Sequence, residues 1–180
     1  MSGTGWTGSS LPYVTPQAAG SPDAWSQETA AQGRRGTQRI IHAGEQAATP
    51  EVAALLALDP GAPVVVRRRI IELDGRPVEL TDSHYPAAIA AGTRLSGTAK
   101  IPGGAVTLLA SLGHVGVRVV ETVTARMPSP DEQRALHLGP GEPVLRLART
   151  TYAADDHPIQ AELMLMPAGT QQRYEIRLDS

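Results

Sequence analysis

The chain has 180 residues, which suits one domain with a short arm, and its 41% hydrophobic and 19% charged residues are ordinary for a globular protein. A net charge of −2 argues against a general polyanion-binding surface, and the lack of cysteine excludes disulfides, thiolate catalysis and cysteine-based zinc sites. Without a signal peptide or an apolar run near the roughly 18 residues of a membrane span, we expect a cytoplasmic protein that does not contact a membrane.

The first 35 residues are predicted to form an arm and one short helix. Residues 1–22 are rich in Gly, Ser, Thr and Pro and have no hydrophobic period, which is typical of a linker. A Ser-Pro-Asp start signal and a stop at Gly33 then predict a helix from about Pro22 to Gln32. The stretch from Thr37 to Ala43 predicts the first strand.

An internal repeat with an offset of 80 residues occupies the middle of the chain. Each unit reads as a capped helix start with proline, a leucine pair, a Pro-Gly turn and a β-hairpin. The matched positions include Thr49 with Ser129, Leu56 with Leu136, Gly61 with Gly141, and, after one extra turn residue, Pro77 with Pro158. We therefore expect residues 49–81 and 129–162 to form equivalent helix-plus-hairpin units of one sheet.

The remaining elements complete the predicted fold. Gly103–Leu112 predicts a helix that Gly113 ends, Val117–Met127 predicts a strand, and residues 174–178 predict a final strand. Long hairpins with few helices indicate an α+β class with short helices on a largely antiparallel sheet, arranged about a pseudo-two-fold axis.

The sequence contains no common motif for a catalytic nucleophile, a metal site or a phosphate site. There is no G-x-S-x-G, no H-E-x-x-H and no phosphate-binding glycine loop, and no two of the five histidines lie at i, i+4 spacing. We therefore expect neither a metal nor a cofactor.

Three strand segments carry polar residues where a pocket could form. Strand alternation puts Arg67 and Arg69 on one face of an apolar strand and Arg68 on the other, as in a charged edge strand or a strand facing a cavity. The next strand has one face with Glu79, Thr81, Ser83 and Tyr85, and Val78 and Leu80 are on the opposite face. In the second hairpin, one strand has a face with Gln160, Glu162, Met164 and Met166. Such faces suit either a small-molecule pocket or a solvated sheet surface.

Four runs together resemble a known family. RRRIIELDGRPVELTDSHYP, IPGGAVTLLASLG, VETVTARMPSPDE and LGPGEPVLRLARTTYAADDHPIQ are similar to the UTRA effector-binding domain, the C-terminal half of GntR-type transcription regulators of the HutC subfamily. The resemblance implies an effector domain over residues 36–180, a chorismate lyase-like fold with six antiparallel strands, a small-molecule metabolite as ligand, and a homodimer. It also implies that DNA is contacted only through a winged helix-turn-helix, which these residues lack, so we expect an isolated effector domain that binds no operator itself.

The resemblance also implies a ligand site. The arginine pair that holds phosphate in sugar-phosphate binders falls on Arg69 and Ile71, and other family ligand positions fall on Thr81, Gly104, Gln160 and Met166. Glu79 and Glu162, two residues from the family acids on the same faces, are candidate substitutes. The predicted ligand-binding residues are thus Arg69, Glu79, Thr81, Gly104, Gln160, Glu162 and Met166, in a pocket less polar than a sugar-phosphate site, between the two hairpins and the Gly103–Leu112 helix.

Two other functions stay open at this point. A stand-alone chorismate lyase-like enzyme, a lyase or cyclase, would use Glu79 and Glu162 as acids and Arg69 as an anion anchor, because such chemistry needs only orientation and general acid–base groups. Alternatively, the chain forms mixed dimers with full-length regulators. We favour the sensor over the enzyme.

Overall fold

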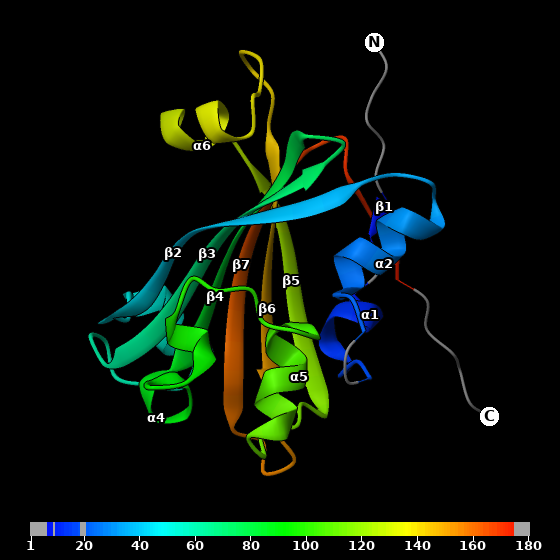
Figure 1. Ribbon diagram of the computed structural model, residues 1–180. Helices are drawn as coiled ribbons and strands as arrows, with labels where there is room; N and C mark the ends of the chain where they lie inside the picture. Colours follow the sequence, from blue (N-terminus) through cyan, green and yellow to red (C-terminus); the bar gives the residue numbers. More distant parts are fainter. Residues whose placement is uncertain (1–6, 9, 19–20, 175–180) are drawn as a thin grey trace, which may run out of the picture.

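Six antiparallel strands form one sheet in the order β2-β3-β4-β7-β6-β5 (Figure 1). In the computed structural model, which describes residues 7–8, 10–18 and 21–174, these strands are β2 (Gly36–Ala47), β3 (Pro63–Leu73), β4 (Arg76–Pro86), β5 (Arg118–Arg126), β6 (Val144–Tyr152) and β7 (Pro158–Pro167). The predicted α+β class and antiparallel sheet are confirmed. A separate parallel pair joins β1 (Thr7–Gly8) to β8 (Gln171–Gln172).

Short helices cover both faces of the sheet. They are α1 (Leu11–Val14), α2 (Ala24–Ala31), α3 (Pro50–Leu55), α4 (Ala87–Ala90), the 3-10 helix η1 (Arg94–Ser96), α5 (Gly104–Ser111) and α6 (Pro130–Ala135). On one face, Val65 and Tyr85 pack against α4, η1 and α5, and Trp25 of α2 packs against Ile71. On the other face, α3 packs against Val64 and Ala161.

The internal repeat is confirmed, and it is longer than the sequence indicated. The order α2-β2-α3-β3-β4 recurs as α5-β5-α6-β6-β7, and the two hairpins meet at the β4–β7 pair in the middle of the sheet. Backbone conformations repeat as well, since residues with positive φ include Gly33 and Gly113, Ala57 and His137, and Gly61 and Gly141. Each of these pairs has the offset of 80.

Some predicted boundaries move. Helix α2 begins at Ala24 because the Asp23 carboxylate, rather than Ser21, caps it by accepting the Ser26 N–H at 3.0 Å. Helix α5 and strand β5 each lie within one residue of their predicted limits, whereas β2 extends four residues further, to Ala47. Of the strand predicted at 174–178, Tyr174 lies outside any strand and the rest lies outside the described residues.

The three consecutive arginines do not mark an edge strand, so that interpretation is wrong. Strand β3 pairs with β2 and β4, and the edges of the sheet are β2 and β5. The buried guanidinium of Arg67 donates to the carbonyls of Arg94, Leu95 and Ala99 at 3.1–3.2 Å, and it also donates to that of Gly97. Arg67 therefore fixes the segment after α4 rather than facing solvent.

Candidate functional site

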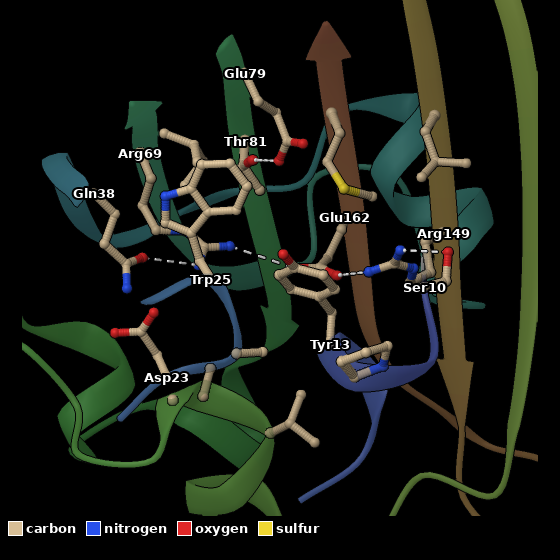
Figure 2. Close-up of a pocket in the computed structure, with 18 of the residues that line it drawn as sticks. Ser10, Tyr13, Asp23, Trp25, Gln38, Arg69, Glu79, Thr81, Arg149 and Glu162 are labelled. Atoms are coloured by element: carbon tan, nitrogen blue, oxygen red, sulfur yellow. Dashed lines mark hydrogen bonds and ion pairs between the residues drawn. The ribbon is translucent and has the colours of Figure 1, made fainter. Parts of the chain in front are cut away.

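A cavity of about 150 Å³ lies between the sheet and the helices α1, α2 and α5 (Figure 2). Strands β3, β4, β6 and β7 form its floor, the first turns of α2 and α5 form two walls, and the N-terminal arm forms a third. All seven residues predicted to contact a ligand line this cavity: Arg69, Glu79, Thr81, Gly104, Gln160, Glu162 and Met166. Their role in binding stays a prediction.

A row of charged and polar side chains crosses the floor. Strand register places Glu121 opposite Arg149, Arg149 opposite Glu162, and Glu162 opposite Ser83. The guanidinium of Arg149 lies 2.6 Å from Glu121 Oε1 and 3.1 Å from Glu162 Oε2, and Ser83 Oγ donates to Glu162 Oε1 at 2.8 Å. The row is thus an ion-pair network within the sheet, at residues with little solvent exposure.

Arg69 joins the same network from the other side. Its Nη2 atom donates to Ser83 Oγ at 2.7 Å and lies 3.4 Å from Glu162 Oε1, while Nη1 lies 3.4 Å from Gln38 Oε1. One carboxylate therefore pairs with two arginines. Burial alone would raise the pKa of Glu162, but Arg149 and Arg69 outweigh burial and hold that pKa below its ordinary value, so Glu162 is ionised at neutral pH.

Arg149 was not among the predicted site residues, although the sequence contains a signal for it. It stands 80 residues after Arg69, the offset of the repeat, on the equivalent strand β6. Since repeat-related strands meet around the pseudo-two-fold axis, the partner of a pocket arginine on one hairpin is expected at the same cavity. Arg69 and Arg149 thus reach the same cavity from equivalent strands of the two repeats.

Glu79 has a different environment from Glu162. Thr81 Oγ1 donates a hydrogen bond to Glu79 Oε1, and no arginine, lysine or histidine within residues 7–8, 10–18 and 21–174 forms an ion pair with this carboxylate. Burial raises the pKa of Glu79, and the hydrogen bond from Thr81 and the charges of Arg69 and Arg149 offset this effect only in part.

A β-bulge corrects the predicted orientation of Val78. Ile71 pairs with Glu79, whereas Glu72 pairs with Pro77, so Val78 is an extra residue on β4. A bulge interrupts the alternation of faces. Val78 therefore lines the cavity beside Glu79 instead of sharing the opposite face with Leu80.

The segment predicted as a linker or arm closes one side of the cavity. Arg149 Nη2 donates to Ser10 Oγ at 3.0 Å, Tyr13 Oη donates to Glu28, and the Gln17 N–H donates to Thr107 Oγ1 at 2.9 Å. Residues on both sides of the predicted division at 35/36 thus line the same cavity, and the division itself stays a prediction. A four-residue helix gives too little periodicity for the sequence to reveal it.

The two helix starts at the cavity differ in their caps. Asp23 caps α2, whereas the equivalent Gly103 has no side chain and places φ at 73° before α5. Gly104 also has a positive φ, 85°, a conformation that favours glycine. The rings of Trp25 and Tyr13 and the side chains of Met164 and Met166 are among the apolar groups of the lining.

The described residues contain neither a cluster of metal ligands nor a membrane-spanning helix. No group of three or more His, Cys, Asp or Glu side chains is placed to hold a metal ion in that part of the chain. None of its helices has the length and hydropathy needed to cross a membrane.

Comparisons with known proteins agree on one family. A family model described as the UTRA domain matches residues 31–170. The chain is 31% identical to the histidine utilization repressor of Pseudomonas putida over 84% of this chain and 59% of that protein. It is also 34% identical to an uncharacterized HTH-type transcriptional regulator of Streptomyces coelicolor over 60% of this chain and 41% of that one. The chain thus spans about half the length of the curated relatives it matches.

Solved structures have the same fold. The effector domain of PhnF from Mycobacterium smegmatis matches with a TM-score of 0.73 at 24% identity, covering 91% of this chain and 99% of that domain. The C-terminal domain of the histidine utilization repressor from Pseudomonas syringae matches with a TM-score of 0.64 at 25% identity, covering 81% of this chain and all of that domain.

Proposed function

Because this chain belongs to the UTRA domain family, we propose that it senses a small-molecule metabolite for a transcriptional regulator of the GntR type, HutC subfamily. The observation that carries the proposal is the cavity of about 150 Å³, on which polar side chains from both repeats and the arm converge. A few convergent polar groups in an otherwise apolar cavity are typical of small-molecule sites. The seven predicted residues, together with Arg149, are the proposed ligand contacts.

Filling the cavity tests this proposal. A library of metabolites is screened for compounds that raise the melting temperature of the chain, and each hit is measured by calorimetric titration. Met166→Tyr adds a ring to a side chain that is only 2% exposed on the cavity floor, so affinity for the hits should fall at least about tenfold. Ile41→Tyr places the same ring at a residue of β2 that is 50% exposed and outside the cavity lining, and it should leave affinity unchanged. Equal affinity in both variants would mean that the effector binds elsewhere.

The relatives favour regulation over catalysis. Their names describe transcriptional regulators, and no observation favours the lyase or cyclase alternative.

We propose that a winged helix-turn-helix outside these 180 residues contacts DNA in the cytoplasm. With a net charge of −2, this chain alone should bind duplex DNA weakly and lose it as salt rises. Nanomolar, sequence-specific binding at physiological salt would contradict this assignment.

We also propose a homodimer. The edge strand β5 and its ends expose apolar side chains, namely Val117, Val120, Val123 and Met127. An unpaired edge with apolar side chains favours association with another chain. Analytical ultracentrifugation should show a dimer at micromolar concentration, and Val120→Glu should shift it toward monomer. A parent chain that stays monomeric under these conditions would exclude the homodimer.

A further inference from the structure

We propose that the cavity selects a compact organic cation, an amine about the size of one aromatic ring, that pairs with Glu79 between Trp25 and Tyr13. This inference rests on the proposed sensor function and specifies the class of its ligand. Three observations carry it. Both arginines of the cavity already pair with carboxylates, no cationic side chain among the described residues pairs with Glu79, and aromatic rings line the cavity near Glu79.

The two arginines of the cavity already have their anions. Glu162 bridges Arg69 and Arg149, and Glu121 pairs with Arg149 from the neighbouring strand, so two positive charges face two negative ones. A phosphate or carboxylate ligand placed between the arginines would meet the Glu162 carboxylate there. Like charges in a buried site repel strongly, and replacing Glu162 as the partner would leave it unpaired. The floor of the cavity therefore disfavours an anionic ligand.

The opposite holds at the Glu79 end of the cavity. Glu79 faces the cavity with only the Thr81 hydroxyl as a hydrogen-bond donor, and the described part of the chain offers it no ion pair (Figure 2). Asp23 on the α2 wall is engaged with Ser26 and lies 3.4 Å from the exposed Lys100 ammonium. Burial first, and then the nearby carboxylates Glu28, Glu79 and Asp23, raise the pKa of Tyr13, which reports the same negative environment.

The walls beside Glu79 suit the apolar body of a cation. Trp25 and Tyr13 both line the cavity, and aromatic faces attract a cation placed over them. The indole N–H of Trp25 donates to the Glu72 carbonyl at 3.1 Å, which fixes the side chain against β3 at the wall of the cavity. A cavity of about 150 Å³ is of the size that holds a benzene ring.

Three probes of nearly equal size and different charge test the inference. Benzylamine, benzyl alcohol and benzoate are titrated into the parent chain at millimolar concentrations and neutral pH, with calorimetry and melting curves as readouts. We expect benzylamine to bind at least about tenfold more tightly than benzyl alcohol, the same factor in an equilibrium constant as a shift of one pKa unit. Benzoate should bind most weakly of the three. A preference for benzoate or for benzyl alcohol would overturn the proposal.

Three substitutions, one of them a control, identify the carboxylate that determines the preference for a cation. Glu79→Gln keeps the shape of the side chain but removes its charge, so affinity for benzylamine should fall to that for benzyl alcohol. Glu45→Gln makes the same change at an exposed site on β2 and should leave the preference intact. Glu162→Gln removes the ion-pair partner of Arg69 and leaves Arg149 with Glu121 alone, so benzoate should now raise the melting temperature. Loss of all probes equally in Glu79→Gln would assign Glu79 a structural role and overturn the proposal.

The outcomes separate this inference from the function on which it rests. If benzoate binds best to the parent chain, the cation class is wrong while the sensor function stands. If no probe binds, and the hits of the metabolite screen bind Met166→Tyr as well as the parent chain, the cavity is not the ligand site and both proposals fail.

Discussion

Glu162 connects the two halves of the molecule through single side-chain contacts. It stands on β7, pairs with Arg149 of its own repeat, and reaches Arg69 and Ser83 of the other. Burial of this group is costly unless it is paired, and both arginines and a hydroxyl satisfy it. The same network that shapes the cavity floor therefore contributes to the specific packing of the sheet centre.

Arg149→Ala should be among the most destabilising single changes in the sheet. It leaves Glu162 and Glu121 without their shared partner at side chains that are 11% and 10% exposed, and breaking a buried ion pair costs about 3–5 kcal/mol. Urea denaturation measures the free energy of unfolding. Arg118→Ala removes an exposed ion pair with Asp156 at the edge of the sheet and should cost clearly less. Equal losses would show that the network contributes no more than a surface pair.

At the scale of elements, the two repeat helices differ in how they are capped. In α6, Ser129 and Glu132 form a capping box, and the Glu132 carboxylate also pairs with Arg126 at 2.7 Å. In α3, the position equivalent to Glu132 is Val52, so only Thr49 caps the helix. The side-chain hydrogen bond from Arg126 is the main cause that lowers the pKa of Glu132 to about 2 from 4.5.

Glu132→Gln should therefore reduce stability in a pH-dependent way. Because the folded pKa lies below the ordinary value, the carboxylate stabilises the fold fully above about pH 4.5 and loses this effect as the pH falls toward 2. Exposure of the pair limits the loss at pH 7 to about 1 kcal/mol. Urea denaturation at neutral and acid pH should show the difference between parent and variant vanish in acid, and a constant difference would contradict the assignment.

The arm is a second element whose attachment can be weakened alone. Its backbone is fixed near α5 by the bond from the Gln17 N–H to Thr107 Oγ1. Thr107→Val removes that acceptor and should cost about 1 kcal/mol locally, so hydrogen exchange in residues 10–17 should speed up roughly fivefold while the sheet is unaffected. Thr122→Val on the exposed edge strand β5 is the control. Unchanged exchange in the arm would mean that other contacts hold it.

For the whole molecule, the sequence predicted the fold better than the site. Helix caps and Pro-Gly turns are local signals, and each occurs twice in this chain. The caps are at Thr49 and Ser129 and the turns at Gly61 and Gly141, so the sequence was enough to predict the repeat and the positions of the two hairpins. The contact between Ser10 and Arg149 joins residues 139 positions apart, and no local pattern announces it. The alternation of polar and apolar residues likewise gives no sign of the bulge at Val78.

The repeat also predicts where the two halves respond differently to one substitution. Gly36 and Gly116 are equivalent glycines, each preceding its first strand or opening it. A Cβ at Gly36 would lie 2.5 Å from both Thr29 Oγ1 and the Trp25 indole nitrogen, which belong to two buried side chains of α2. At Gly116 it would meet only the terminal methyl group of one side chain, the buried Thr151.

Gly36→Ala should therefore cost more than Gly116→Ala. Overpacking a rigid contact costs about 1–3 kcal/mol, and Thr29 cannot withdraw without breaking its bond from the Gly36 N–H at 3.0 Å. Displacement of Trp25 should also change the cavity wall, so Gly36→Ala alone should alter affinity for benzylamine. Gly169→Ala, where a Cβ meets open space, is the control for both measurements. Equal effects of the two substitutions on unfolding and on binding would show that α2 adjusts as freely as Thr151, and that the first repeat does not hold the cavity wall rigidly.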